Sequence, residues 1–500
     1  VASTDAYAGN IEVSIGGDTE ISSQNGYALE EVITAKDEQS DVKVVDITAG
    51  SFEGNAGQGT IKITDTTVDN GSVAVTGGQV VGDPSDDAVV SIGGMSLTDF
   101  IETSVDEGKQ GATHVTVTTD ENGKDVMVIV SGSTPKQQET IADYPNQAVN
   151  WRWSGLDDDP MTEVITANLK LDQLQINQDY DQTVTIKDGV TLEVGSVVLG
   201  KNAKIIVEPG ATFKVTKKDG IYSPKASNLV LQTQAGKPSI FLFDPAVSTN
   251  AHPKATVQFK STKSFRVDKD NKQWERFGLP TWKGITSLTC DNGTLRTQFD
   301  IFGPTGWQYC GILNDDKEPV DISKLDKPFV SCELLAATGS TTPANATYTF
   351  TGELTGNMDA TLNVDHEWTP FANSYSANID AVALLAGTGG TNVAQDIYLA
   401  EDGGNGSIIW DTYVPSFDPG KQLAPMEAFI LHNTGNVAEE STINYANTRL
   451  SRPVRAEDGH LLTLIDVQRD RFRHPMIRMS WNTVLYVNDF SFHNPCTLSL

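Results

Sequence analysis

An internal repeat in the middle of the chain constrains the fold more than any other feature. The segment Lys187–Val194 (KDGVTLEV) matches Glu208–Val215 (EPGATFKV) at an offset of 21 residues. Each copy places a glycine-containing turn before a strand of alternating character. A turn and strand that recur every ~20 residues are typical of a β-solenoid, whose coils pack their apolar side chains on one another. Two ordinary hairpins of a sandwich are the alternative interpretation.

Short strands dominate the rest of the sequence. Val, Ile and Thr alternate with polar residues in short runs separated by Gly, Asn and Asp, which is the pattern of β-strands. The intervals leave little room for crossover helices, and only 28–35 and 96–105 predict short helices. We therefore predict an all-β fold with a β-solenoid (parallel β-helix-like) segment and one or more antiparallel β-sandwich domains. Examples of the runs are Asn10–Ile15, Val42–Ile47, Thr60–Ile63, Ser72–Val75 and Asp125–Val130.

Composition changes along the chain and indicates domain boundaries. The first 150 residues hold no Trp, Arg or Cys and carry 25 acids against 6 Lys, whereas the remaining 350 carry 41 acids against 30 bases. The polar, Pro-punctuated stretch between them predicts a boundary. The predicted segments are an acidic N-terminal β-domain (1–135), a linker (136–160), a solenoid-like segment (161–250), a β-domain with Cys290, Cys310 and Cys332 (251–345), and a sandwich-like C-terminal domain (346–500).

The charge excludes two classes of partner. Acids outnumber Lys and Arg 66 to 36 in 500 residues, which gives a formal net charge of −30. Nucleic-acid binding needs a cationic surface to neutralise phosphates, and an anionic membrane surface needs one as well. The sequence also lacks a run of about 18 apolar residues, so we predict no membrane insertion.

Three stretches of the sequence resemble large exported proteins of Bacteroidota. The segment 183–215 (TVTIKDGVTLEVGSVVLGKNAKIIVEPGATFKV) is similar to their solenoid phrase "gatLtv…g…i.v..Gatf.v". Further on, 368–380 (WTPFANSYSANID) resembles a degraded "W.liGNPyPsaId", and 423–430 (LAPMEAFI) resembles "i.pmQaFfv". Here Ala372-Asn-Ser374 replaces the Gly-Asn-Pro core. The order and spacing agree over residues 160–455.

This resemblance implies location and architecture. Such proteins are exported and displayed or assembled at the cell surface, so we expect an extracellular or cell-surface protein after removal of a signal peptide. The resemblance also implies an O-glycosylation site at Thr66, because Asp65-Thr-Thr67 fits the acidic-hydroxyl-small sequon of Bacteroidota.

Motifs for catalysis are missing from the sequence. It contains no G-x-S-x-G elbow and no GxxxxGK[ST] loop, and its seven His residues never occur at i, i+2 or i, i+4. We therefore predict no catalytic residues, no bound cofactor and no cleft that gathers a perturbed carboxylate pair with a basic partner.

Two other kinds of site can be considered. Cys290 and Cys310 flank turns and could form a disulfide in an exported chain, although buried free thiols are the favoured interpretation. Acidic turns could bind calcium, and the candidates are Asp157, Asp158, Asp159 and Asp402. Acidic loops that only keep the protein soluble are the simpler interpretation.

The leading functional hypothesis is a non-enzymatic extracellular structural protein that self-associates into a filament or surface layer. A glycan-binding surface adhesin is the main alternative. Trp151 and Trp153 are candidate sugar-stacking platforms on one strand face, although packing in the core or at an interface is the favoured interpretation. A phage or appendage fibre and a solenoid polysaccharide-degrading enzyme are further alternatives. The partners we expect are therefore other copies of the chain and glycans.

Overall fold

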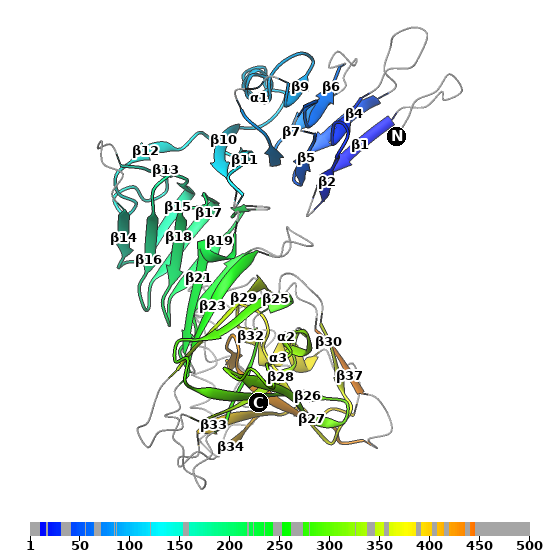
Figure 1. Cartoon of the computed structure of the whole chain (residues 1–500), viewed down its shortest axis with the longest axis vertical. Coiled ribbons are helices and arrows are strands. Elements are labelled where there is room, and N and C mark those ends of the chain that lie inside the picture. The colour runs from blue at the N-terminus through cyan, green and yellow to red at the C-terminus, as the bar shows by residue number, and fades with distance from the viewer. Residues whose placement is uncertain are drawn as a thin grey trace, which may run out of the picture. The chain divides into compact units, whose positions relative to one another are not determined.

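The computed structural model describes most of residues 11–445. Gaps fall at 17–18, 32–41, 56, 65–71, 85, 87, 121, 154–159, 218–219, 224, 235, 244–252, 262–273, 280, 326, 338–345, 355–359, 387–391, 403–407, 415–419 and 436–440. The described part is almost entirely β-structure (Figure 1). None of its helices has the length and apolar character needed to span a lipid bilayer.

The N-terminal segment is itself a parallel solenoid with three sheets. Strands of successive coils pair in parallel in the orders β1-β4-β7, β2-β5-β8 and β3-β6-β9. Of the two arrangements consistent with the strand pattern, a solenoid or a separate sandwich, the chain adopts the solenoid here. The coils are β1 (Ile11–Ile15), β2 (Glu20–Ser22) and β3 (Leu29–Glu30); β4 (Val42–Ile47), β5 (Ser51–Glu53) and β6 (Ile61–Ile63); and β7 (Ser72–Val75), β8 (Gly78–Val81) and β9 (Val90–Ile92).

One of the two predicted short helices forms. Helix α1 (Leu97–Asp106) follows the third coil, and the Ser96 hydroxyl caps it by accepting a hydrogen bond from the Asp99 N–H. The helix predicted at 28–35 is wrong, because Leu29 and Glu30 form β3 and pair with the next coil. The hairpin of β10 (Thr113–Thr119) and β11 (Asp125–Ser131) then extends the sheet of β8.

A second parallel solenoid occupies the middle of the chain and has two sheets. Its strands lie side by side in Figure 1, from β14 to β23. One sheet is β12 (Lys136–Gln138), β13 (Ala148–Trp151), β15 (Leu169–Ile176), β17 (Thr191–Leu199), β19 (Thr212–Val215) and β22 (Ile240–Phe243), with β20 (Ile221–Tyr222) beside β17. The other begins with β14 (Met161–Ile165), β16 (Gln182–Ile186), β18 (Ala203–Val207), β21 (Leu229–Gln234) and β23 (Lys254–Lys260), with the short 3-10 helix η1 (Ala226–Asn228) before β21.

The 21-residue repeat sets the register of this solenoid. Leu192 lies opposite Phe213 in the neighbouring strand. The turn glycines of the two copies, Gly189 and Gly210, both adopt positive φ angles, of 73° and 84°, which residues with a Cβ rarely adopt. All eight side chains predicted to point inward are at most 1% exposed, which confirms the prediction: Val184, Ile186, Leu192, Val194, Ile205, Val207, Phe213 and Val215.

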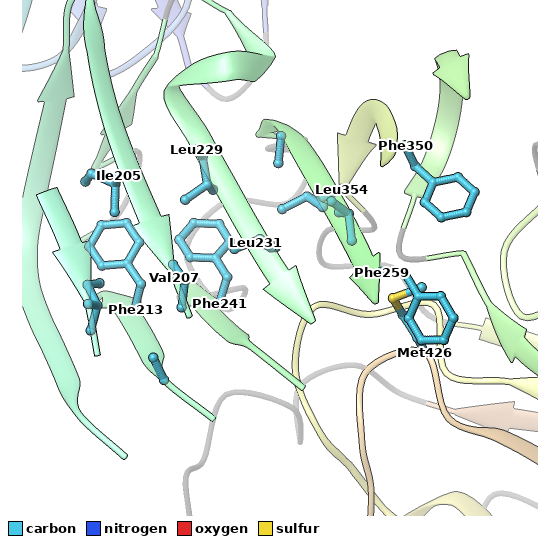
Figure 2. Packing of buried hydrophobic residues seen from close by; sticks show 14 of the residues in the cluster. Ile205, Val207, Phe213, Leu229, Leu231, Phe241, Phe259, Phe350, Leu354 and Met426 are labelled. Carbon is cyan, nitrogen blue, oxygen red and sulfur yellow. The ribbon is translucent and has the colours of Figure 1, made fainter. Parts of the chain in front are cut away.

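The interior of the solenoid is a continuous apolar stack. Figure 2 shows Ile205, Val207 and Phe213 beside the side chains of the next coil. The rings of Phe213 and Phe241 stack with centroids 5.4 Å apart. Close packing of this kind supplies the main favourable term in folding, and each coil depends on its neighbour for it.

Part of the predicted linker at 136–160 forms strands of the solenoid. In the 136–160 segment, β12 pairs in parallel with β13, and β13 pairs in parallel with β15. Ile141, Val149 and Trp151 are fully buried. The polar, Pro-punctuated composition did not predict these strands, because they are short and few of their residues point inward. The solenoid therefore begins at Lys136 and not at 161.

Antiparallel strands close the solenoid. Strand β29 (Thr347–Leu354) pairs antiparallel with β23 on one side and with β25 (Thr281–Cys290) on the other. The same core cluster contains solenoid residues together with Phe299, Tyr348 and Phe350, so packing runs across the boundaries predicted near 250 and 346.

Antiparallel sheets make up the C-terminal part of the described chain, as predicted. A four-stranded sheet has the order β24-β28-β26-β27, and a second has the order β31-β36-β33-β34. The Gly278 N–H donates to the Met426 carbonyl at 2.9 Å, and Val330 bridges Phe371. The elements are β24 (Trp274–Gly278), β26 (Arg296–Gly303), β27 (Gly306–Leu313), α2 (Ile322–Leu325), β28 (Ser331–Ala337), β30 (Ala360–Val364), β31 (Trp368–Ala372), β32 (Ile379–Asp380), α3 (Ala381–Ala386), β33 (Ile397–Asp402), β34 (Ile408–Tyr413), β35 (Gln422–Leu423), β36 (Ala428–His432) and β37 (Ser441–Tyr445).

The motif at 368–380 has a structural role. The amide of Asn373, which is fully buried, donates to the carbonyls of Ala377 and Leu423 at 2.8 and 2.9 Å. The Ser374 hydroxyl accepts from the Phe329 N–H at 2.7 Å. These bonds satisfy backbone groups in a buried turn, which would be costly to leave unpaired.

Candidate functional site

The candidate site begins on the outward face of the four-stranded sheet. In β26, Thr297, Phe299 and Ile301 are buried, whereas the alternating residues Gln298, Asp300 and Phe302 point to the opposite face. Because side chains alternate along a strand, the neighbours of Asp300 and Phe302 across the sheet share this face.

A polar row crosses all four strands of this sheet. Arg276 lies opposite Glu333, Glu333 opposite Asp300, and Asp300 opposite Tyr309. A guanidinium nitrogen of Arg276 lies 3.5 Å from a Glu333 carboxylate oxygen. The Gln298 amide donates to both Asp300 oxygens, at 2.9 and 3.1 Å. The row therefore places two carboxylates next to each other on neighbouring strands.

Burial and neighbouring charge perturb these groups. Burial raises the pKa of Glu333, and the charge of Asp300 raises it further, while Arg276 partly offsets both. Burial also raises the pKa of Asp300, against the effect of the Gln298 amide. The Tyr309 hydroxyl donates to Glu318, and this bond raises the pKa of Tyr309 to about 12. Tyr309 is therefore a neutral phenol at physiological pH.

Two tryptophans enclose Arg276. Its guanidinium carbon lies 5.0 Å from the ring centroid of Trp307 in β27 and 4.9 Å from that of Trp410 in β34. Trp307 and Trp410 belong to different sheets, so the arginine links the sheets through two cation–π contacts. The positive charge of Arg276 is therefore already engaged by groups of the protein.

Further rings lie on the adjoining sheet. The rings of Trp368 and His432, which face each other on β31 and β36, are 4.1 Å apart between centroids and only 4° from parallel. The Tyr398 ring packs edge-on against Trp368 at 4.8 Å. Trp410 of β34 lies opposite Ala400 of β33. Ala400 is two residues from Tyr398 along β33, so Trp410 lies on the same face of the sheet as Tyr398.

Phe302 links Trp307 to His366, which lies two residues before Trp368 in the sequence. The Phe302 ring lies 5.5 Å from Trp307 and 5.1 Å from His366, and His366 pairs with Asp365 at 2.7 Å. Together these side chains form one surface, which we term the aromatic face. It comprises Phe302, Trp307, Tyr309, His366, Trp368, Tyr398, Trp410 and His432, with Arg276, Asp300 and Glu333 among them.

Exposure distinguishes this face from the core. Among the described residues, three of the four exposed large aromatic side chains lie here: Trp307 is 36% exposed, Tyr309 45% and Trp368 42%. An exposed ring held by a second ring offers a flat apolar platform, and nearby carboxylates, imidazoles and hydroxyls supply hydrogen bonds. The arrangement can bind a flat ligand that has both an apolar face and hydroxyl groups.

The predicted tryptophan pair does not form a platform. Trp151 is only 1% exposed, and its indole N–H donates to the Glu139 carbonyl at 3.1 Å. Trp153 is 45% exposed but lies beyond the end of β13, so the two rings do not share a strand face. This part of the glycan hypothesis is wrong, and the exposed rings on the aromatic face take its place.

The candidate disulfide between Cys290 and Cys310 does not form, and both residues are free thiols. Cys290 ends β25 in the sheet that closes the solenoid, whereas Cys310 lies in β27 of the four-stranded sheet. The two strands belong to different sheets, which sequence spacing could not reveal. Cys310 and Cys332 are buried, in agreement with the alternative of buried free thiols.

The remaining candidates give no site in the structure. Asp157, Asp158, Asp159 and Thr66 lie outside the described residues. Asp402 ends β33, and its side chain is likewise outside the described set. Across the part of the chain that the structure describes, no three His, Cys, Asp or Glu side chains gather in a way that could hold a metal ion.

The prediction that no cleft gathers a perturbed carboxylate pair with a basic partner stays a prediction, but a perturbed carboxylate pair does lie beside a basic side chain on this face of the sheet. Asp300 and Glu333 are such a pair, and Arg276 is the basic partner. The sequence carried a signal in the alternation of Gln298, Asp300 and Phe302 and in Trp307 and Tyr309 across the Gly303–Gly306 turn. Which strands flank this hairpin depends on tertiary pairing.

Comparison of the chain with protein-family models, with curated proteins and with solved structures found no match.

Proposed function

We propose that the chain is an extracellular glycan-binding surface protein, with the parallel solenoids as its scaffold and the aromatic face as its binding site. The observation that carries the proposal is the exposed ring of Trp368, stacked in parallel on His432. Sugar rings present C–H groups on one face and hydroxyls at the edge, which complements an aromatic platform beside polar groups. The resemblance to exported Bacteroidota proteins supports the extracellular location.

The proposal is binding without turnover. A glycosidase needs two carboxyl groups free to act on the glycosidic bond. Here Glu333 is paired with Arg276, and the Asp300 carboxylate accepts from Gln298 at both oxygens. Both carboxyl groups are therefore engaged by the protein. In this proposal Glu333 holds Arg276 in place, and Asp300 accepts hydrogen bonds from sugar hydroxyls.

A glycan array that carries neutral, amino and uronic acid glycans tests the proposal. The intact chain should bind a subset of glycans, and Trp368→Ala should lose most of that binding. Trp153→Ala is the matched control, because Trp153 is equally exposed but does not belong to the aromatic face. Absence of binding by the intact chain, or equal loss in both variants, would contradict the proposal.

Self-association is a second candidate function. In the described part of the chain, β1, β2 and β3 each lie at the end of their sheet, so the first coil presents strand edges that another copy could pair with. The excess of acids in the first 150 residues favours contact with a less acidic part of another copy. Sedimentation at low and high salt, with calcium or a chelator, tests this. A protein that stays monomeric at high salt with calcium would contradict it.

A further inference from the structure

We infer that the aromatic face is selective for neutral glycans and rejects glycans that contain uronic acids. This inference rests on the proposed function, and it names the ligand class for the same site. The face is rich in carboxylates, and its arginines are already paired with protein groups. Both features determine which ligands can be bound without repulsion.

Arg276 is not free to bind a carboxylate group of a ligand. Arg276 is paired with Glu333 and enclosed by Trp307 and Trp410, and its side chain is 17% exposed. Recognition of a carboxylate ligand by arginine relies on a free pair of N–H groups that can bond both oxygens. Arg276 would have to leave Glu333 buried and unpaired to bind a uronate, and that loss would oppose binding.

Arg296 is engaged as well. It belongs to the same face of β26, because it alternates with Gln298 and Asp300, and it forms an ion pair with Asp315. Neither arginine on the described surface of this sheet is therefore left without an acidic partner. An anionic ligand would have to compete with an existing carboxylate at each of them.

The carboxylates outnumber the arginines. Two arginines are matched by Glu333 and Asp315, and four further carboxylates on or beside the face have no Lys or Arg partner among the described contacts. These four are Asp300, Glu318, Asp365 and Asp396, which bond to Gln298, Tyr309, His366 and Tyr398. A surface of this sign repels a uronate and accepts hydrogen bonds from the hydroxyls of a neutral sugar.

The rings are suited to a neutral sugar for a separate reason. A cationic ligand is attracted to the faces of tryptophan rings, but Arg276 already occupies the space between Trp307 and Trp410. The exposed platform of Trp368 is stacked on His432 and carries no cation. Stacking of C–H groups on that ring needs no charge on the ligand.

Calorimetric titration of the full chain can test the selectivity. The ligands are neutral gluco-, xylo- and mannohexaose, an oligogalacturonate of the same length and a glucosamine hexamer. We expect at least one neutral hexamer to bind more than about ten-fold tighter than the oligogalacturonate, a difference of about 1.4 kcal/mol. Neutral binding should change little between low and high salt, because no ion pair with the ligand is formed.

A charge variant links selectivity to the face. Asp300→Asn removes one negative charge at nearly constant shape, so the affinity for oligogalacturonate relative to the best neutral hexamer should rise by about two- to ten-fold. Trp153→Ala should leave this ratio as in the intact chain.

The outcomes separate the two proposals. Tightest binding of the oligogalacturonate, lost in Trp368→Ala, would overturn the rejection of uronic acids and leave the glycan site intact. An unchanged ratio in Asp300→Asn would also overturn the selectivity argument. Failure of all five ligands to bind would overturn the proposed function and the inference with it.

Discussion

Trp368 and His432 face each other on neighbouring antiparallel strands, with ring centroids 4.1 Å apart and planes that differ by 4°. His432 thus fixes the plane of a tryptophan that is 42% exposed. A ring held in one orientation loses less side-chain entropy when a ligand binds, which favours affinity.

His432 is therefore expected to act as a positioning residue for glycan binding. His432→Ala should weaken binding about two- to ten-fold, because the stacked pair contributes about 0.5–1.5 kcal/mol. His432→Phe keeps a stacking partner and should restore most of the affinity. Calorimetry on the three proteins checks this, and equal affinities would show that Trp368 needs no support.

Truncation of a side chain in β18 should destabilise the protein only where that side chain points into the solenoid core. Ile205 is fully buried in β18, whereas its neighbour Lys204 is exposed on the opposite face. Ile205→Ala should lower the free energy of unfolding by about 2–5 kcal/mol, because the cavity adds to the lost apolar burial. Lys204→Ala should change it by less than about 0.5 kcal/mol. Denaturant titration of both variants is the measurement, and similar losses would argue against the predicted side-chain directions.

The raised pKa of Asp300 predicts a pH-dependent effect on stability. Because the folded-state pKa lies above the unfolded one, the ionised carboxylate destabilises the native state above both values, and this effect vanishes below about pH 4. Asp300→Asn removes the titration. The stability of this variant relative to the intact chain should therefore increase as pH rises from 3 to 7. Thermal or urea unfolding across that range, without glycan, gives the comparison. A constant or opposite difference would contradict the burial of Asp300.

The cysteines should differ in reactivity. Burial raises the pKa of all three thiols, Cys290, Cys310 and Cys332, but Cys310 and Cys332 are buried whereas Cys290 is partly exposed. Among these three described cysteines, alkylation of the native protein should label Cys290 first, and Cys310 and Cys332 should react only after unfolding. Mass spectrometry of the labelled peptides identifies each site. A Cys290 that cannot be alkylated without reductant would indicate the disulfide that the structure lacks.

Much of the solenoid could be predicted from sequence because its contacts are local and repetitive. The offset between Leu192 and Phe213 is the length of one coil, so the repeat also gives the strand register. The inward direction of Ile205 and Val207 follows from period-2 alternation. In the N-terminal segment the alternation is similar, but the sequence shows no clear repeat, so a sandwich and a solenoid could not be distinguished.

The candidate site could not be predicted in the same way, because it depends on contacts between distant segments. Arg276 and Trp410 are 134 positions apart in the sequence and belong to separate sheets. Glu333 and Asp300 become neighbours only through the pairing of β26 with β28. For Trp151 the sequence allowed either a surface platform or the favoured core packing, and the solenoid core encloses its ring.

The most direct test of glycan binding at the aromatic face is oxidative footprinting of tryptophans, with and without a mixture of neutral gluco-, xylo- and mannohexaose. Peptide mass spectrometry reports the oxidation of each indole. Trp307, Trp368 and Trp153 are all exposed and should be oxidised in the free protein. The account predicts that saturating glycan protects Trp307 and Trp368 and leaves Trp153 unchanged. Protection of Trp153 alone, or no protection at Trp368, would contradict it.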